Sequence, residues 1–263
     1  MKQEEWAELQ QLEFKYHEAK DEARVLKYKL PYWRRLLAEL PQQARPGVDS
    51  HVLEIGCGGC ALLLALEQGK LVGIDPLMDR YLEKFPYLTE RTDVEWINGS
   101  AEEADFKNSF DVVFAINSFD HVHDPKLVVE NIARSLRPGG HCILTLNSHN
   151  TRFFRAYYRL LYKVIDPHHP YQFTPQDLVQ MFSSFTPVVV REIDDLWFPF
   201  AEGYYRDVLG RSFESKQKWR RAALNPFKWP MGLLKFGFNM PPHKKRPGQR
   251  SIYSDYLYVF RLD

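Results

Sequence analysis

Cysteine, glycine and long apolar runs are all scarce in this chain of 263 residues. It has three cysteines, two of them in one short loop, which excludes a disulfide framework and predicts a reducing, cytoplasmic location. With only 14 glycines and 17 prolines, the chain is neither fibrous nor wholly disordered. No apolar run approaches the roughly 18 residues that a membrane-spanning helix requires, and the first residues lack the apolar core of a signal peptide.

Net charge is also nearly absent, at +1, but the charges are unevenly distributed. Between Glu202 and Arg250 there are 12 Lys or Arg and 3 Asp or Glu, whereas residues 1–201 carry 22 basic and 29 acidic residues. A basic segment rich in aromatic side chains is therefore attached to an acidic body. The acidic body argues against nucleic acid as a partner.

From residue 51 onward, short apolar strands alternate with helical segments. Seven strands are predicted, at residues 51–56, 70–76, 93–101, 110–118, 141–148, 188–196 and 251–262. Helices are predicted at residues 61–69, 124–136, 151–165 and 174–182, the last with Thr174 as its N-cap. Strands separated by helices indicate parallel βαβ units, so the predicted fold is an α/β doubly wound sheet.

The chain is predicted to divide into four regions: an N-terminal helical arm (1–47), a ligand-binding core (48–195), an aromatic and basic insertion (196–250) and the last strand of the core sheet (251–263). The arm is read as helical from residue 3 to 40, because apolar residues recur there at near-helical spacing. An interruption is expected at Pro31, since proline lacks the backbone N–H that a helix interior uses.

A glycine loop marks the predicted ligand site. Gly56, Cys57 and Gly58 follow the first predicted strand, where glycine permits a tight turn and a close approach of the backbone to a ligand. Asp75 ends the next strand, and a carboxylate there can accept hydrogen bonds from two ribose hydroxyls. Glu54, just before the loop, can help to hold an ammonium group. Together these residues predict a nucleoside-binding crevice at the carboxyl ends of the strands.

The glycine loop alone would also pass a relaxed dinucleotide fingerprint, so a nicotinamide-dependent oxidoreductase is one alternative. A dinucleotide offers no ammonium group, however, and the segments FDVVFAINSFDHVHDP and LRPGGHCILTL are foreign to dehydrogenases. With these motifs, residues 50–150 resemble the class I S-adenosylmethionine-dependent methyltransferases, in the small-molecule branch that includes ubiquinone-biosynthesis enzymes. The similarity continues loosely to residue 195. It implies a Rossmann-like sheet with an antiparallel last strand, and methyl transfer to a small-molecule or lipid-linked acceptor, with oxygen preferred.

The resemblance also implies which residues contact the cofactor S-adenosylmethionine. Glu54, Gly56 and Gly58 would hold its methionine end, and Cys57, between the two glycines, is a further predicted contact. The remaining implied contacts are Asp75 at the ribose, Pro76, Leu77, Ser100 and Ala101 near the adenine, and Asn117 and Ser118 beside the transfer site. Two positions depart from the family pattern. Cys60 stands where the family often has Gly, and Ser100 stands where it often has Asp, which weakens recognition of the adenine amino group.

A general base helps methyl transfer when the acceptor is a hydroxyl. The predicted candidates are Asp120 and His121, after the fourth strand, and His169, in a region that commonly faces the acceptor in related enzymes. With His123 and His168 these residues could also be pictured as a metal cluster. Spacing across loops carries no coordination geometry, so no metal is predicted.

Other interpretations of the same features stay open. Cys57 and Cys60 have the spacing of a redox pair but lack thioredoxin-like surroundings. A protein that binds the cofactor without turnover, for example as a membrane scaffold, is another alternative. The arm often covers the acceptor pocket in the family, which would bring Tyr28, Tyr32 and Trp33 to substrate. Residues 196–250 form a lid, a solvated insertion, or a peripheral contact with an anionic membrane at its inner face.

Overall fold

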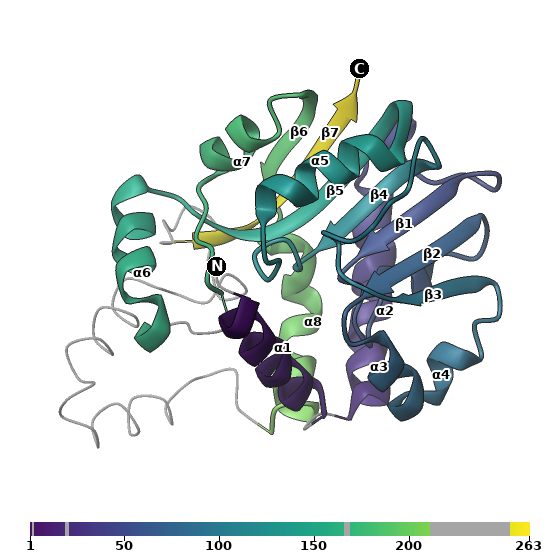
Figure 1. Cartoon of the computed structure of the whole chain (residues 1–263). Helices are drawn as coiled ribbons and strands as arrows, with labels where there is room; N and C mark the ends of the chain where they lie inside the picture. Colours follow the sequence, from purple (N-terminus) through teal and green to yellow (C-terminus); the bar gives the residue numbers. More distant parts are fainter. Residues whose placement is uncertain (2, 19–20, 166–168, 211–252) are drawn as a thin grey trace.

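The protein is described from a computed structural model, for residues 1, 3–18, 21–165, 169–210 and 253–263 (Figure 1). Its centre is a seven-stranded sheet in the order β3-β2-β1-β4-β5-β7-β6. The strands are β1 (His51–Ile55), β2 (Lys70–Asp75), β3 (Val94–Asn98), β4 (Phe110–Ile116), β5 (Leu136–His149), β6 (Phe185–Glu192) and β7 (Tyr253–Leu262). Only β7 runs antiparallel to its neighbours, so the predicted doubly wound sheet with an antiparallel last strand is confirmed.

Helices cover both faces of this sheet (Figure 1). The helices are α1 (Gln3–Glu18), α2 (Glu22–Ala38), α3 (Met78–Lys84), α4 (Pro86–Thr89), α5 (Pro125–Ser135), α6 (Arg152–Ile165), α7 (Pro175–Met181) and α8 (Asp194–Asp207). Leu36 of α2 and Leu196 of α8 belong to the apolar core on one face, whereas Val128 of α5 and Leu178 of α7 belong to the core on the other. All four of these side chains are at most 1% exposed.

The helix predicted at residues 61–69 is wrong. Only a short 3₁₀ turn forms there, at Leu62–Ala65. The buried Glu54 carboxylate accepts hydrogen bonds from the backbone N–H groups of Leu62 and Leu63, at 3.0 Å each, and so holds the chain in a turn at this point. Gly69, at a φ of +109°, then leads directly into β2.

The N-terminal arm also differs from the prediction. It forms two helices, and the second begins after Asp21, whose side chain accepts a hydrogen bond from the backbone N–H of Arg24. Pro31 lies inside α2 without ending it. The predicted interruption at Pro31 is therefore wrong, because the N-cap at Asp21, ten residues earlier, starts the helix that contains this proline.

Strand β6 lies earlier than predicted, because the chain enters α8 at Asp194. Thr174 is the N-cap of α7, as predicted, and forms a capping box with Asp177. Helix α8 occupies the start of the predicted insertion, and residues 211–250 lie outside the described part of the chain. Among the described residues, no helix combines the length and apolarity needed to cross a membrane.

Candidate active site

A cavity of about 440 Å³ lies at the carboxyl ends of β1, β2 and β4. Its floor contains the glycine loop after β1, and helix α1 contributes five of the side chains on its other side. Ligand sites in α/β sheets lie at this edge, where the strand order reverses around the first strand. The volume is in the range of small-molecule sites. The predicted crevice is therefore present as a cavity, partly covered by the N-terminal helix.

The glycine loop has the backbone geometry that requires glycine. Gly56 has a φ of +63° and Gly58 a φ of +56°. A Cβ at Gly56 would lie 2.4 Å from the Cβ of Ser118, whereas a Cβ at Gly58 would meet no atom within 4 Å. Ser118 in turn donates a hydrogen bond to the carbonyl oxygen of Ile55, at 2.7 Å. Gly56 thus permits close contact between the ends of β1 and β4, and Gly58 leaves open space beside the cavity.

Asp75 is buried at the end of β2 and lines the cavity. Its two carboxylate oxygens accept hydrogen bonds from the backbone N–H groups of Leu77, at 2.9 Å, and Gly58, at 3.0 Å. Burial raises the pKa of Asp75 to about 6, although these two hydrogen bonds act to lower it. Each carboxylate oxygen has a second lone pair, so the group can still accept hydrogen bonds from two hydroxyls of a ligand.

Glu54 is placed differently from its predicted role. It is 2% exposed and is not among the residues that line the cavity. Burial raises the pKa of this carboxyl to about 8, against the effect of the N–H groups of Leu62 and Leu63. The side chain therefore holds the glycine loop to the turn that follows it, and the structure does not bring it to a ligand's ammonium group.

The other residues predicted to contact the cofactor meet at the cavity. These are Cys57, Pro76, Leu77, Ser100, Ala101, Asn117 and Ser118. The Ser100 hydroxyl donates to a Glu103 carboxylate oxygen at 3.0 Å. Asn117 has a φ of +52°, a conformation that asparagine tolerates better than most residues. Burial raises the pKa of the Cys57 thiol well above its usual value, which disfavours the thiolate that redox chemistry needs.

Asp120, His121 and His169 come together on one side of the cavity, although His169 follows the other two by nearly fifty residues. One Asp120 oxygen lies 3.7 Å from Nε2 of His121, and the other lies 3.9 Å from Nε2 of His169. The imidazole ring centres are 4.9 Å apart. Both histidines line the cavity, while Asp120 is buried behind them at 4% exposure. His168 lies outside the described residues.

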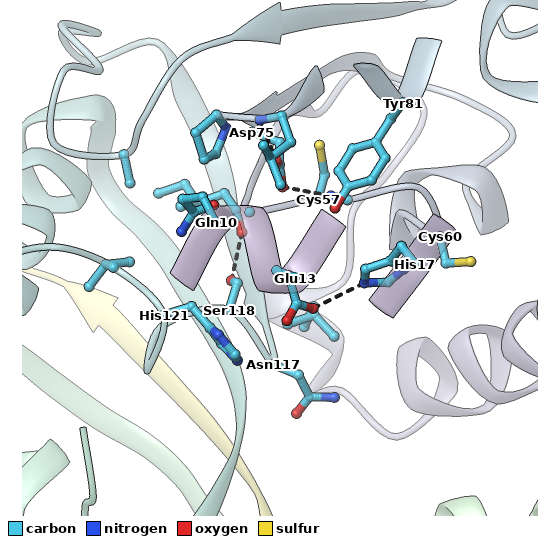
Figure 2. A pocket seen from close by; sticks show the side chains of 18 of the residues that line it. Gln10, Glu13, His17, Cys57, Cys60, Asp75, Tyr81, Asn117, Ser118 and His121 are labelled. Carbon is cyan, nitrogen blue, oxygen red and sulfur yellow. Dashed lines mark hydrogen bonds and ion pairs between the residues drawn. The ribbon is translucent and has the colours of Figure 1, made fainter. Parts of the chain in front are cut away.

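Helix α1 supplies cavity residues that the sequence analysis did not identify. Glu13 accepts a hydrogen bond from His17 at 3.1 Å, and it lies between His121 and His17 in Figure 2. Burial acts to raise the pKa of Glu13, but the bond from His17 and the charges of His121, His17 and His169 lower it to about 2. The available signal was the spacing of Glu13 and His17, which places both side chains on one face of a helix.

The aromatic residues predicted at the acceptor separate into two groups. Trp33 lines the cavity, whereas Tyr28 and Tyr32 do not. Tyr28 donates a hydrogen bond to Asp207, at the end of α8. Tyr32 is buried against Trp197 of α8, with ring centres 5.1 Å apart. These two tyrosines therefore join α2 to α8.

Comparison with known proteins identifies the domain. Residues 53–144 match the family model described as a methyltransferase domain. The chain carries a class I S-adenosylmethionine-dependent methyltransferase domain. The matched segment covers about a third of the chain and contains the glycine loop, Asp75, Asn117 and the Asp120–His121 pair. The cofactor of this methyltransferase domain is S-adenosylmethionine, and the oxidoreductase alternative is not favoured.

Curated relatives and solved structures agree with this assignment. The chain is 30% identical over 111 residues to a ubiquinone biosynthesis O-methyltransferase of Aliivibrio fischeri, covering 39% of this chain and 46% of the relative. A protein of the same name from Saccharophagus degradans is 33% identical over 112 residues, covering 40% and 47%. The match thus spans about half the length of these relatives.

Two solved structures have the same fold. One is a putative methyltransferase from Bacillus halodurans, with a TM-score of 0.56 and 20% identity, covering 86% of this chain and 96% of that one. The other is a geranyl diphosphate C-methyltransferase from Streptomyces coelicolor in complex with S-adenosyl-L-homocysteine, with a TM-score of 0.55, 12% identity, and coverage of 87% and 77%.

The cavity fits S-adenosylmethionine on observations of this structure. The open space beside Gly58 is the kind of cradle that a side chain would fill. Asp75 has acceptor capacity left for a ribose diol, and the positive charge of the sulfonium and ammonium groups would face a cavity that contains Glu13 and Asp75.

Proposed function

We propose that this protein transfers the methyl group of S-adenosylmethionine to a hydroxyl oxygen of a small or lipid-linked acceptor. The observation that carries the proposal is one cavity that contains both Asp75 and the pair His121 and His169. Asp75 is suited to binding the ribose of the cofactor, and the two histidines are suited to removing a proton from the acceptor. The curated relatives support oxygen as the methylated atom, because they are named O-methyltransferases.

In this proposal the cofactor extends from the end of β3 across the glycine loop toward α1. Ser100, Ala101 and Pro76 flank the adenine, and Asp75 accepts from the ribose hydroxyls. Gly56, Cys57, Gly58, Asn117 and Ser118 lie along the methionine end. Glu54 acts indirectly, by holding the loop in place through Leu62 and Leu63.

Glu13 is proposed to take the ammonium group. Its pKa of about 2 keeps it ionised at neutral pH, and it lines the cavity from α1. A charge-assisted hydrogen bond between a carboxylate and an ammonium group is stronger than one between neutral groups. This assignment replaces the contact that the sequence suggested for Glu54.

The acceptor is proposed to lie between α1 and the histidines. Trp6, Tyr16, Trp33 and Tyr204 line the cavity, and aromatic side chains favour packing against a flat, apolar ring. The indole N–H of Trp6 donates to the backbone carbonyl of His121 at 3.0 Å, which joins the helix to the acceptor side. An acceptor that carries a hydroxyl on an aromatic ring or a lipid-linked head group suits these surroundings.

The residues then align the reactants, exclude water and remove a proton from the acceptor. S-adenosylmethionine, when bound, supplies a methyl group on a strongly electrophilic sulfonium, so the protein needs mainly to align the reactants and exclude water. Nε2 of His121 or His169 takes the proton of the acceptor hydroxyl. With the cofactor bound, the deprotonated oxygen would take the methyl group, and the electrons of the carbon–sulfur bond would remain on sulfur. Asp120 lies behind the two imidazoles, where its charge would stabilise the imidazolium that forms.

Labelled methyl transfer to a panel of hydroxylated aromatic acceptors tests the proposal. We expect product from the wild-type protein, and a fall in turnover of about 10²-fold or more in the double variant His121→Ala/His169→Ala. S-adenosylhomocysteine affinity should change little in that variant. His51→Ala, at the opposite end of β1, is the matched control. Binding of cofactor without transfer to any acceptor would favour the scaffold alternative, and binding of NAD alone would favour the oxidoreductase.

Peripheral contact with an anionic membrane is a further part of this proposal, since a lipid-linked acceptor would be met there. It is supported by the excess of basic residues between Glu202 and Arg250. Co-sedimentation with vesicles that contain anionic lipid should occur at low salt and decrease with added salt. Protein that stays in the supernatant at low salt would contradict this part alone.

A further inference from the structure

Three metal-ligand atoms converge beside the cavity. Asp120, His121 and His169 each offer one such atom, and these atoms all lie within 4.8 Å of one another. The first two residues follow β4, and the third lies between α6 and α7. The tertiary fold therefore assembles two imidazoles and one carboxylate at a single point.

The buried Asp120 carboxylate has one oxygen without a hydrogen-bond partner among the described residues. The side chain is 4% exposed, and the oxygen without a partner is Oδ1. The distances of 3.7 Å and 3.9 Å to the two imidazoles are too long for hydrogen bonds. A buried carboxylate is costly unless it is paired, hydrogen-bonded or bound to a metal, so a cation held between Asp120 and the two imidazoles would satisfy this oxygen.

The separations are close to those of a metal site. Ligand atoms bound to one tetrahedral zinc ion, at about 2.0–2.1 Å each, lie about 3.3 Å from one another. The Asp120 distances of 3.7 Å and 3.9 Å involve its two different oxygens, and the three ligand atoms lie within 4.8 Å of one another. Shifts of up to about 1.5 Å would bring them to that spacing. Glu13 lines the same cavity and adds a further carboxyl group to its surroundings.

We infer that Asp120, His121 and His169 form a binding site for a divalent transition-metal ion, with Zn²⁺ the best match to the donor set. Two imidazoles and a carboxylate leave at least one coordination position free. His121 and His169 line the cavity, so the free position faces the acceptor. With the ion bound, His121 and His169 would be its ligands and could not accept a proton. The cation would bind the acceptor hydroxyl oxygen and lower its pKa, so that the proton leaves to solvent. This role rests on the proposed function, whereas binding of the ion does not.

Cobalt binding tests the site directly. The full chain, treated with a chelator and then dialysed, is titrated with Co²⁺, and the visible absorption of the bound ion is recorded. We expect one equivalent to bind and Zn²⁺ to displace it. Asp120→Asn and His169→Asn should weaken binding by more than about 100-fold, since even loss of an outer-shell partner costs up to that amount. His51→Ala should bind cobalt as the wild type does.

Two measurements keep the outcomes separate. Thermal stabilisation by S-adenosylhomocysteine shows that each variant is folded. Absence of a cobalt spectrum in wild-type protein, or an undiminished spectrum in the folded variants, would overturn the metal site. Methyl transfer at full rate by the metal-free protein would overturn the cation's role and leave the proposed function intact. A bound cobalt ion without methyl transfer to any acceptor would contradict the proposed function and retain the site.

Discussion

Two carboxylates of the molecule are placed differently from what their sequence positions suggest. Glu54 belongs to the glycine motif, but it bonds to the N–H groups of Leu62 and Leu63 and does not line the cavity. Glu13 belongs to no motif, yet it lies in the cavity. The recognition of a charged ligand is decided by which carboxylate reaches the cavity, and a one-dimensional motif does not contain that information.

Replacing each carboxylate should therefore have a different effect. Glu13→Gln should weaken S-adenosylhomocysteine binding by about 10-fold or more, because a hydrogen bond to a charged group contributes about 1.5–3 kcal/mol. Glu54→Gln should leave that affinity within a few-fold and should lower stability, since its amide NH₂ cannot accept from a backbone N–H. Calorimetric titration and urea unfolding measure the two effects. Weaker binding in Glu54→Gln with unchanged binding in Glu13→Gln would contradict the assignment.

Alanine substitutions at the two glycines of the loop, Gly56 and Gly58, can be compared directly. Both have positive φ, so alanine costs about 1–2 kcal/mol at either position. At Gly56 the new Cβ would also collide with Ser118, and overpacking adds about 1–3 kcal/mol. Gly56→Ala should therefore unfold at lower urea concentration than Gly58→Ala, and Gly58→Ala should retain the fold with weaker cofactor binding. Equal stability of the two variants would be the contrary result.

At the scale of elements, α1 covers the cavity while burying only one of its own side chains, Phe14. Its contacts include Phe14, which is buried in the core and lies under the guanidinium of Arg80 at 3.4 Å, and Trp6, which bonds to the loop after β4. Most of its remaining side chains are exposed or half-buried. Because α1 covers the cavity, a cofactor has to enter beneath or beside it.

Ligand binding should then stabilise α1 more than the sheet. We expect S-adenosylhomocysteine to slow amide hydrogen exchange at residues 3–18 by about 10-fold or more, while α5, on the opposite face, changes little. Mass-spectrometric exchange with and without ligand measures this, because helices that open locally are protected when a ligand binds only the closed form. The same protection in both helices would indicate global stabilisation and would contradict a separate motion of α1.

At the scale of the whole molecule, the sequence predicted the sheet well because its signals are local. Each strand is a short apolar run bounded by turn residues, as at His51–Ile55. The failed helix at residues 61–69 and the continuation of α2 through Pro31 depend instead on hydrogen bonds and caps that apolar spacing does not encode. The assembly of His169 with Asp120 depends on tertiary packing alone. Fold and cofactor could thus be predicted. On the acceptor side the sequence suggested Asp120, His121 and His169 as candidates, but not that they meet at one point.

Stability of the whole molecule should fall as the pH rises from 5 to 8. Burial raises the pKa of Glu54 to about 8, of Asp75 to about 6 and, together with Asp194, of Asp255 to about 7. In the unfolded chain these carboxyls lose their protons near pH 4. Between pH 5 and pH 8 the folded state therefore binds more protons than the unfolded state. The stability that these protonated carboxyls contribute is fully present below pH 4, and it is lost as the pH rises through their folded pKa values. Burial lowers the pKa of His141, which opposes the trend through a single group.

Urea unfolding at pH 5 and pH 8 measures the effect. For the wild-type chain without ligand we expect a free energy of unfolding lower by a few kcal/mol at pH 8, because each tenfold difference in proton affinity between the folded and unfolded states corresponds to about 1.4 kcal/mol. Glu54→Gln should flatten this dependence, because it removes the carboxyl that titrates last. Glu67→Gln, at an exposed position, should retain the wild-type slope. A free energy of unfolding that stays constant or rises between pH 5 and pH 8 would mean that the buried carboxyls are ionised in the folded state. Glu54 would then hold the glycine loop as a charged group and not as a protonated one.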